Sequence, residues 1–120
     1  MTDTTYDSQN IFARILRGEI PAKKIYEDDY ALAFPDIAPK APVHILVIPK
    51  GAYRDVYDFG ARAGSEEIAG FARAVSKIIA QENLESAGFR VISNCGLHGG
   101  QEVPHYHVHI LGGKALGAMI

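Results

Sequence analysis

The chain has 120 residues, of which 48% are hydrophobic and 22% charged, and these proportions are ordinary for one globular domain. Its formal net charge of −2 argues against bulk electrostatic binding to nucleic acid or to an anionic membrane surface. No apolar run approaches the roughly 20 residues that span a bilayer. Residues 1–10 lack the basic and apolar parts of a secretory signal, and the single cysteine, Cys95, fits a reducing compartment. We therefore expect one soluble, cytoplasmic domain over residues 1–120.

The first half of the chain predicts one helix and three strands. Residues 1–7 are polar and are expected to form a loose tail. From Ser8, apolar residues recur at spacings of three and four, which predicts a helix that ends at Gly18. Strands are expected at 22–27 and 30–35, joined by a turn at Asp28-Asp29, and at 43–48, which is rich in β-branched residues.

The second half predicts one long helix and two strands. Residues 50–64 give only a weak and broken helical signal, because three glycines interrupt it. A clear amphipathic helix follows, capped by Ser65 and fading near residues 83–84. The short connections predict an α+β fold in which two main helices pack on a mainly antiparallel sheet of about five strands. The last expected elements are a strand at 89–93, a glycine-rich loop at 94–101 and a strand at 105–111.

The last expected strand carries three histidines at alternate positions, within the sequence HYHVHILGG. Because successive side chains of a strand point to opposite faces, the three histidines share one face. We expect the apolar residues between and beyond them to pack under a helix, and the histidines to face a cleft or solvent. The histidines are His105, His107 and His109, and the apolar set is Tyr106, Val108 and Ile110.

Three interpretations of this histidine face are open. It could be merely polar, which is uncommon for three histidines in register. It could bind a metal, because imidazole suits zinc, copper and iron. At about 3.3 Å per residue, however, the outer rings are roughly 13 Å apart, so one ion reaches two of them and needs a further ligand such as His44, Cys95 or His98. No carboxylate lies beside the motif, and we expect no metal. In the third interpretation, the central imidazole is a nucleophile or base and its neighbours bind charge and fix its tautomer.

The loop NCGLHGGQ, directly before the last strand, is a candidate anion site. Its three glycines would let backbone N–H groups approach a ligand closely. Glycine-rich turns are also common between strands that bind nothing, so the loop alone is weak support. Together with the histidines it favours nucleophilic substitution at phosphorus, on a substrate with one firmly held phosphoryl group.

The stretch GGQEVPHYHVHILGGK resembles the signature of the histidine triad family. The two glycines after the histidines resemble its Hint branch, the purine nucleoside phosphoramidases, and not the Fhit branch of dinucleoside polyphosphate hydrolases. Residues 11–50 read like the N-terminal half of Hint proteins, and residues 8–113 can all be placed, with the weakest match at 51–90. The resemblance implies an α+β half-barrel whose sheet continues across a homodimer. We expect residues 114–120 to dock at that dimer interface.

The resemblance also implies a reaction, the hydrolysis of the P–N bond in purine nucleoside 5′-phosphoramidates, with acyl-adenylates as related substrates and no cofactor. By position, His107 is the nucleophile that forms a nucleotidyl-histidine, and His109 hydrogen-bonds the phosphoryl or leaving group. His105 and His44 support the histidine network. For the nucleotide, the resemblance implies that Asn94 and the backbone of Gly100, Gln101 and Glu102 lie along the phosphate, that Asp36 binds the ribose hydroxyls, and that Ile11, Phe12, Ile15, Phe34 and Ile37 form the base pocket.

Several of these residues have simpler explanations. The apolar residues of the first helix could be ordinary core, and Asp36 could be a turn residue. Glu102 stands where some relatives carry a serine, so any phosphate contact there comes from the backbone. His44 lies among apolar residues and needs a buried partner. Two rival functions also fit the same motif: a dinucleoside polyphosphate hydrolase, and a purine-nucleotide-binding or partner-binding dimer without catalysis.

Overall fold

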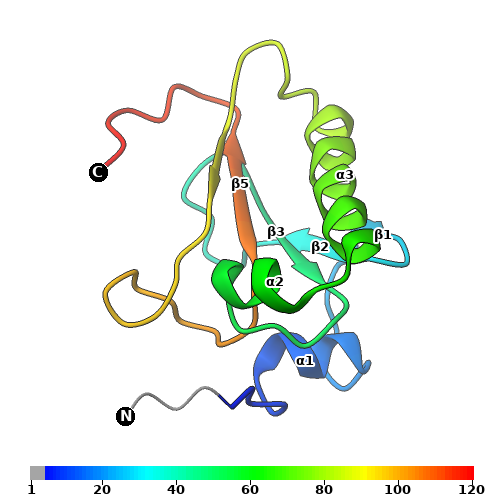
Figure 1. Cartoon of the computed structure of the whole chain (residues 1–120). Helices are drawn as coiled ribbons and strands as arrows, with labels where there is room; N and C mark the ends of the chain where they lie inside the picture. The colour runs from blue at the N-terminus through cyan, green and yellow to red at the C-terminus, as the bar shows by residue number, and fades with distance from the viewer. Residues whose placement is uncertain (1–4) are drawn as a thin grey trace.

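The computed structural model describes residues 5–120 and contains one five-stranded, fully antiparallel sheet with helices against it (Figure 1). This confirms the α+β class and the expected sheet of about five strands. In the sheet the strands have the order β1-β2-β3-β5-β4. The strands are β1 (Tyr26–Glu27), β2 (Ala31–Pro35), β3 (Val43–Pro49), β4 (Arg90–Ile92) and β5 (Val108–Gly112); the helices are α1 (Ile11–Leu16), α2 (Val56–Arg62) and α3 (Ser65–Gln81).

Helix α1 begins three residues later than the sequence predicts. Asn10 caps it, because its side-chain oxygen accepts a hydrogen bond from the backbone N–H of Ala13 at 2.9 Å. Gly18 follows the helix with a φ of 80°, a conformation that suits glycine. Residues 1–4 of the expected loose tail lie outside the described part of the chain. Within the rest of that tail, Tyr6 is hydrogen-bonded to the body of the protein.

The first hairpin is shorter than expected on one side. β1 covers two residues where a strand was predicted over 22–27, because it lies at the sheet edge and exposed Lys23 and Lys24 precede it. The turn falls where predicted, since the Asp28 carboxylate accepts hydrogen bonds from the backbone N–H groups of the residues after it. β2 and β3 match their predicted spans to within one residue.

The weakly predicted stretch before the long helix contains a real helix, α2. Asp55 caps it by accepting a hydrogen bond from the N–H of Asp58 at 2.8 Å, and Asp58 in turn accepts one from Arg62 Nε at 2.6 Å. These local bonds outweigh the glycines that made the helical signal look broken. The cap of α3 is Gly64, not Ser65, and the Glu67 carboxylate accepts from its N–H at 3.2 Å. In the chain from residue 5 onward, no helix is long and apolar enough to cross a membrane.

The two faces of the sheet carry different cores. Helices α2 and α3 lie against one face (Figure 1). On this face Tyr106, Val108 and Ile110, the apolar residues between and beyond the histidines, pack under a helix as predicted. Helix α1 covers part of the other face. The first cluster includes Tyr106, Val108, Ile110, Phe71, Ala74 and Ile78; the second consists of Phe12, Ile15, Leu32, Phe34, Leu46 and Ile48.

Candidate active site

The three histidines of the motif do not lie along one exposed strand face. β5 begins only at Val108, and the residues before it leave the strand ladder. His105 is 0% exposed and His107 6% exposed, so the expectation that the histidines face a cleft or solvent is wrong for His105. The physical reason is local: Pro104 has no N–H for a ladder, and the N–H of Tyr106 instead donates to the carbonyl of Tyr53 at 2.7 Å.

The ring of His105 is held at both nitrogens. Its Nε2 lies 3.0 Å from the carbonyl oxygen of Pro49, and its Nδ1 lies 2.6 Å from the hydroxyl of Tyr6. A carbonyl can only accept, so Nε2 carries the proton and Nδ1 is an acceptor. Burial lowers the pKa of His105 to about 4, which keeps this ring neutral at physiological pH.

His107 is oriented by the backbone carbonyl of His105. Its Nδ1 lies 2.7 Å from the carbonyl oxygen of His105, so Nδ1 carries the proton. Burial lowers the pKa of His107, and the neutral ring therefore keeps its lone pair on Nε2. The ring of Phe12 packs edge-on against this imidazole, with 5.0 Å between ring centroids. Such a ring has the tautomer and the protonation state that a nitrogen nucleophile requires.

His44 and His109 form a second hydrogen-bonded pair. The backbone N–H of Lys40 donates to His44 Nδ1 at 3.0 Å, so the proton of His44 is on Nε2. His44 Nε2 lies 2.9 Å from His109 Nδ1 and donates to it, which leaves the Nε2–H of His109 as a donor. Burial, and then the neighbouring His107 and His44, lower the pKa of His109 to about 4. His44 thus has the hydrogen-bond partners that its apolar surroundings require.

The fold brings a carboxylate to this pair that the sequence pattern does not reveal. Asp36 Oδ2 lies 3.4 Å from His44 Nε2 and 4.0 Å from His109 Nδ1. Across residues 5–120, Asp36, His44 and His109 are the side chains grouped closely enough to suggest a metal site. Their ligand atoms all lie within 4.8 Å of one another. These tautomers fit a hydrogen-bond chain better than a metal site. His44 Nδ1 already accepts a hydrogen bond, and its protonated Nε2 cannot bind a metal. Cys95 and His98 are not part of this group.

The residues expected to bind the base divide into two sets. Phe12, Ile15 and Phe34 are buried together in the cluster under α1, and Phe12 packs edge-on against Phe34 with 5.6 Å between ring centroids. Ile11 is 46% exposed and Ile37 is fully exposed, and neither belongs to that cluster. The structure therefore groups the three buried residues, of which Phe12 contacts His107, and leaves the other two at the surface.

The glycine-rich loop is organised by the side chain of Gln101. Its Nε2 donates to the carbonyls of Arg54 at 2.6 Å and Val103 at 3.0 Å, and its Oε1 accepts from the N–H of Gly96 at 2.9 Å. Gln101 thus holds the loop and does not extend its amide toward a ligand. Gly100, with a φ of 72°, and the exposed Glu102 lie on either side of it.

Asn94 follows β4, the strand that pairs with β5. The β4–β5 ladder ends where Ile92 pairs with His109, two residues before Asn94. Next to it, Ser93 Oγ donates to the carbonyl of His107 at 3.3 Å. The sequence places Asn94 in a loop before the motif, and the contact of Ser93 shows that this loop begins beside His107.

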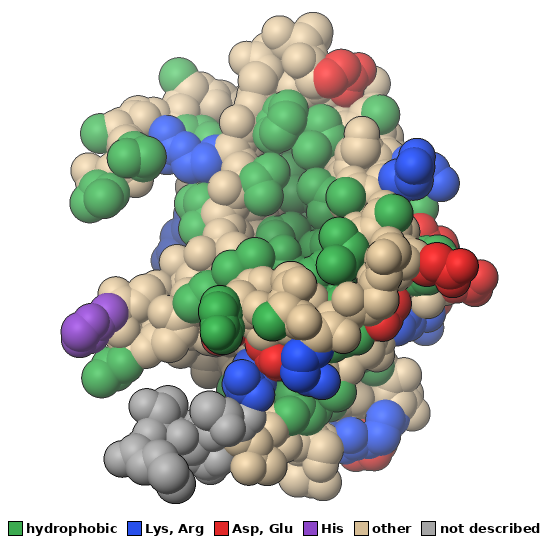
Figure 2. All heavy atoms as spheres, viewed as in Figure 1, with side chains coloured by type: hydrophobic (Ala, Val, Ile, Leu, Met, Phe, Trp, Pro, Cys, Tyr) green, Lys and Arg blue, Asp and Glu red, His purple; other side chains and the backbone are tan. Residues whose placement is uncertain are grey.

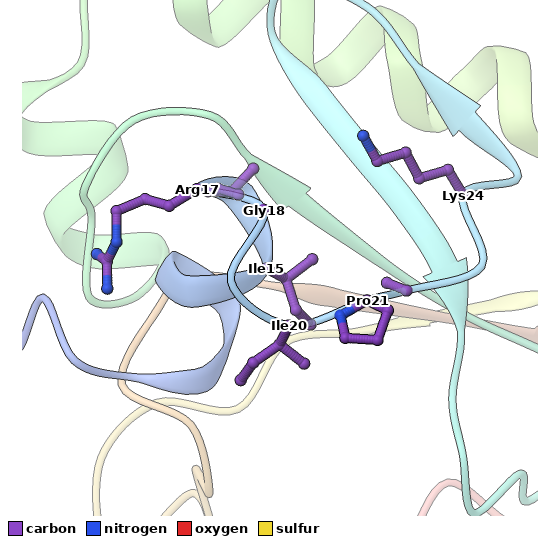
Figure 3. Close-up of a pocket in the computed structure, with 8 residues that line it drawn as sticks. Ile15, Arg17, Gly18, Ile20, Pro21 and Lys24 are labelled. Carbon is purple, nitrogen blue, oxygen red and sulfur yellow. The ribbon is translucent and has the colours of Figure 1, made fainter.

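Two cavities lie near the site residues, and His107 does not line either of them. The first, of about 310 Å³, lies at the end of α1 and is lined by residues 15–18, 20–22 and 24 (Figure 3). Its Arg17 is held by Glu19, with Nε 2.6 Å from Oε2, and shares no contact with the histidines. The second, of about 300 Å³, reaches Asp36 and His44 and connects this part of the site with the surface.

An antiparallel sheet that carries His-x-His-x-His directly after a glycine-rich loop defines the histidine triad class. The HIT domain profile matches residues 17–116, and the chain therefore belongs to the HIT domain family. It is 58% identical to a 13.2 kDa HIT-like protein of Azospirillum brasilense, covering 97% of this chain and 95% of that protein. It is 43% identical to the purine nucleoside phosphoramidase of Escherichia coli K12, covering 93% of each chain. A HIT family hydrolase from Clostridium thermocellum has the same fold, with a TM-score of 0.84 and 35% identity over 93% of this chain and 96% of that one.

Proposed function

We propose that this protein hydrolyses the P–N bond of purine nucleoside 5′-phosphoramidates through nucleophilic attack by His107. The observation that carries the proposal is the 2.7 Å hydrogen bond from His107 Nδ1 to the carbonyl of His105, which leaves the Nε2 lone pair available. The relative in Escherichia coli, named a purine nucleoside phosphoramidase, supports the same substrate class, and related acyl-adenylates would react at the same phosphorus.

In the first step His107 Nε2 attacks the phosphorus, and the P–N bond to the amine breaks. The amine leaves with a proton from solvent, and the ring becomes a cationic nucleotidyl-imidazole. The carbonyl of His105 accepts from Nδ1–H more strongly once the ring is cationic, so this bond stabilises the transition state more than the ground state. In the second step water attacks the phosphorus and loses a proton to solvent, and Nε2 leaves as neutral imidazole, so the proton released balances the one that left with the amine.

His109 is proposed to donate its Nε2–H to a phosphoryl oxygen or to the leaving group. This role follows from the chain of donors that runs from the Lys40 N–H through His44 to His109 and ends at a free N–H. The carboxylate of Asp36 lies beside the same pair, and its Oδ1 accepts from the N–H of Ala38 at 2.8 Å. That bond fixes the rotamer, so that Asp36 is held in place to accept hydrogen bonds from ribose hydroxyls.

The remaining nucleotide contacts are proposed from the parts of the site already described. The buried aromatic pair Phe12 and Phe34 is proposed to bind the purine, because Phe12 packs against His107, with Ile11 and Ile37 at the rim. The loop that Gln101 holds is proposed to bind the phosphate through other backbone N–H groups, because those of Gly96, Gly100 and Gln101 donate within the loop.

A homodimer whose sheet continues through β4 is part of this proposal. β4 is an edge strand, and Val91 on it and Phe89 just before it are 44% and 43% exposed. Figure 2 shows apolar side chains gathered on the face between α3 and β5, beside this edge. The C-terminal segment is linked to the start of the same strand, because the Arg90 side chain donates to the carbonyls of Gly117 and Ala118. An unpaired edge with apolar neighbours favours pairing with a second copy.

The proposal is tested with His107→Ala, assayed on an adenosine 5′-phosphoramidate, with Tyr57→Ala as the control because Tyr57 is 79% exposed on α2. We expect loss of nearly all turnover in the first variant and none in the second. Retained turnover in His107→Ala, or loss of wild-type turnover on adding a chelator, would contradict the mechanism. Faster turnover of dinucleoside polyphosphates would favour the rival hydrolase, and nucleotide affinity without turnover of either class would favour a binding protein.

A further inference from the structure

Tyr6, in the segment before α1, is joined directly to the histidine cluster. Its hydroxyl lies 2.6 Å from His105 Nδ1, and its ring packs edge-on against that imidazole with 5.7 Å between centroids. The amide nitrogen of Asn10 lies 2.9 Å from the same hydroxyl. Tyr6 is half-buried, and burial raises the pKa of its hydroxyl, which therefore stays protonated. None of the roles assigned above to the catalytic histidines involves this residue.

The directions of these hydrogen bonds are fixed by chemistry. The carbonyl of Pro49 accepts from His105 Nε2–H, so in the neutral ring Nδ1 can only accept. The Tyr6 hydroxyl must therefore donate to His105. The amide nitrogen of Asn10 can only donate, so it donates a hydrogen bond to the Tyr6 oxygen. The chain from Asn10 through Tyr6 and His105 to Pro49 has one donor and one acceptor at each contact.

This chain of hydrogen bonds affects His107 because His105 belongs to the chain and also binds His107 through its carbonyl. The ring of His105 is held at both ends, and its backbone N–H donates to the carbonyl of Val103 at 2.8 Å. The carbonyl of the same residue accepts the Nδ1–H of His107. If the ring of His105 turns or gains a proton, the carbonyl that orients His107 is no longer held in one place.

We propose that Tyr6 is a positioning residue of the active site, which keeps His105 in its neutral Nε2–H tautomer and thereby keeps His107 in the Nδ1–H tautomer with Nε2 free to react. Its effect on turnover rests on the proposed function, whereas its effect on the two tautomers does not. Asn10 extends the link to α1, because it also caps the helix that places Phe12 against His107.

Two variants of the full chain test this proposal. Tyr6→Phe keeps the ring and removes only the hydroxyl. Asn10→Asp keeps a side-chain oxygen that caps Ala13 but removes the amide donor. The new carboxylate accepts a hydrogen bond from the Tyr6 hydroxyl and so draws that hydroxyl away from His105. Tyr57→Phe is the matched control, because Tyr57 is 79% exposed on α2. Nitrogen-15 NMR of the imidazoles reads the tautomer and titration of each histidine, and steady-state kinetics on an adenosine 5′-phosphoramidate separates kcat from KM.

We expect wild type to show His105 as Nε2–H and His107 as Nδ1–H. In Tyr6→Phe and Asn10→Asp the titration of His105 should move to higher pH, the Nδ1–H population of His107 should fall, and kcat should drop about tenfold, the effect of one lost hydrogen bond, with KM nearly constant. Tyr57→Phe should match wild type. Unchanged imidazole spectra in Tyr6→Phe, or a loss confined to KM, would overturn the proposal. Absence of turnover in wild type would refute the proposed function alone, and the spectra would still decide the role of Tyr6.

Discussion

Substitution of Gly99 by alanine tests whether the glycine-rich loop must keep its shape for turnover. A Cβ at Gly99 would lie 2.8 Å from the backbone nitrogen of Cys95 and closer still to its carbonyl oxygen, whereas ordinary van der Waals contact begins at 3.4 Å. Both obstacles are backbone atoms, so no side chain can rotate away. The loop between Asn94 and Gln101 must therefore open by more than half an ångström.

The expected magnitude follows from that displacement. A misplacement of about 1 Å near a reacting centre costs on the order of 100-fold in rate. A shift of more than half that distance predicts a fall in kcat/KM of at least about tenfold. The effect on folding should be small, because residues 96–100 are exposed and bury little apolar surface.

The assay is kcat/KM on an adenosine 5′-phosphoramidate, together with urea unfolding of the same samples. Gly60→Ala is the control, because Gly60 lies inside α2 and its added Cβ would meet nothing within 4 Å. That variant should keep wild-type kinetics and gain about 0.5–1 kcal/mol of stability. If Gly99→Ala keeps kcat/KM within about twofold of wild type, the loop does not hold the phosphate in the way proposed.

Three further predictions concern pH, stability and assembly. Burial lowers the pKa of His107 from its usual 6.5, so kcat/KM should hold as pH falls to that value and decline only below it; a decline beginning above pH 6.5 would be inconsistent. Arg62 holds the pKa of Asp58 at about 2, below its usual 3.8, so Asp58→Asn should cost about 1–2 kcal/mol at neutral pH, after allowance for solvent screening of the exposed Arg62. Because the carboxylate contributes only while ionised in the folded state, urea unfolding should show that cost shrinking as pH falls from about 4 through 2, and an equal cost at both ends would argue against it. Truncation after Gly113 should weaken dimerisation about tenfold by sedimentation; an unchanged dimer would show that residues 114–120 do not dock there.

Much of the fold could be predicted because it depends on local patterns. The β-branched run of β3, the amphipathic period of α3 and the turn at Asp28 are each encoded in a local stretch of sequence, and the structure has all three. The failures have local physical causes as well. The sequence signal for α2 looked broken by glycines, yet a cap at Asp55 and an ion pair within the helix suffice to form it.

The site was harder to predict because its geometry depends on contacts between distant segments. The alternation of histidines is correct as a pattern, but Pro104 takes His105 out of the strand and into the core, which strand periodicity cannot show. Asp36 is more than 70 residues from His109 in sequence, and only the pairing of β2, β3 and β5 brings them together. Tyr6 lies in a polar segment without any periodic signal, and its contact with His105 spans 99 residues.

The central claim is that His107 carries the nucleotide covalently during turnover. It is tested most directly by quenching the wild-type protein at neutral pH within one turnover of an adenosine 5′-phosphoramidate, followed by proteolysis and mass spectrometry. The account predicts one adenylyl group on the peptide that contains residues 105–109, located on His107 and absent from His107→Ala. Hydrolysis without any adduct at the shortest times, or an adduct on a different histidine, would contradict it.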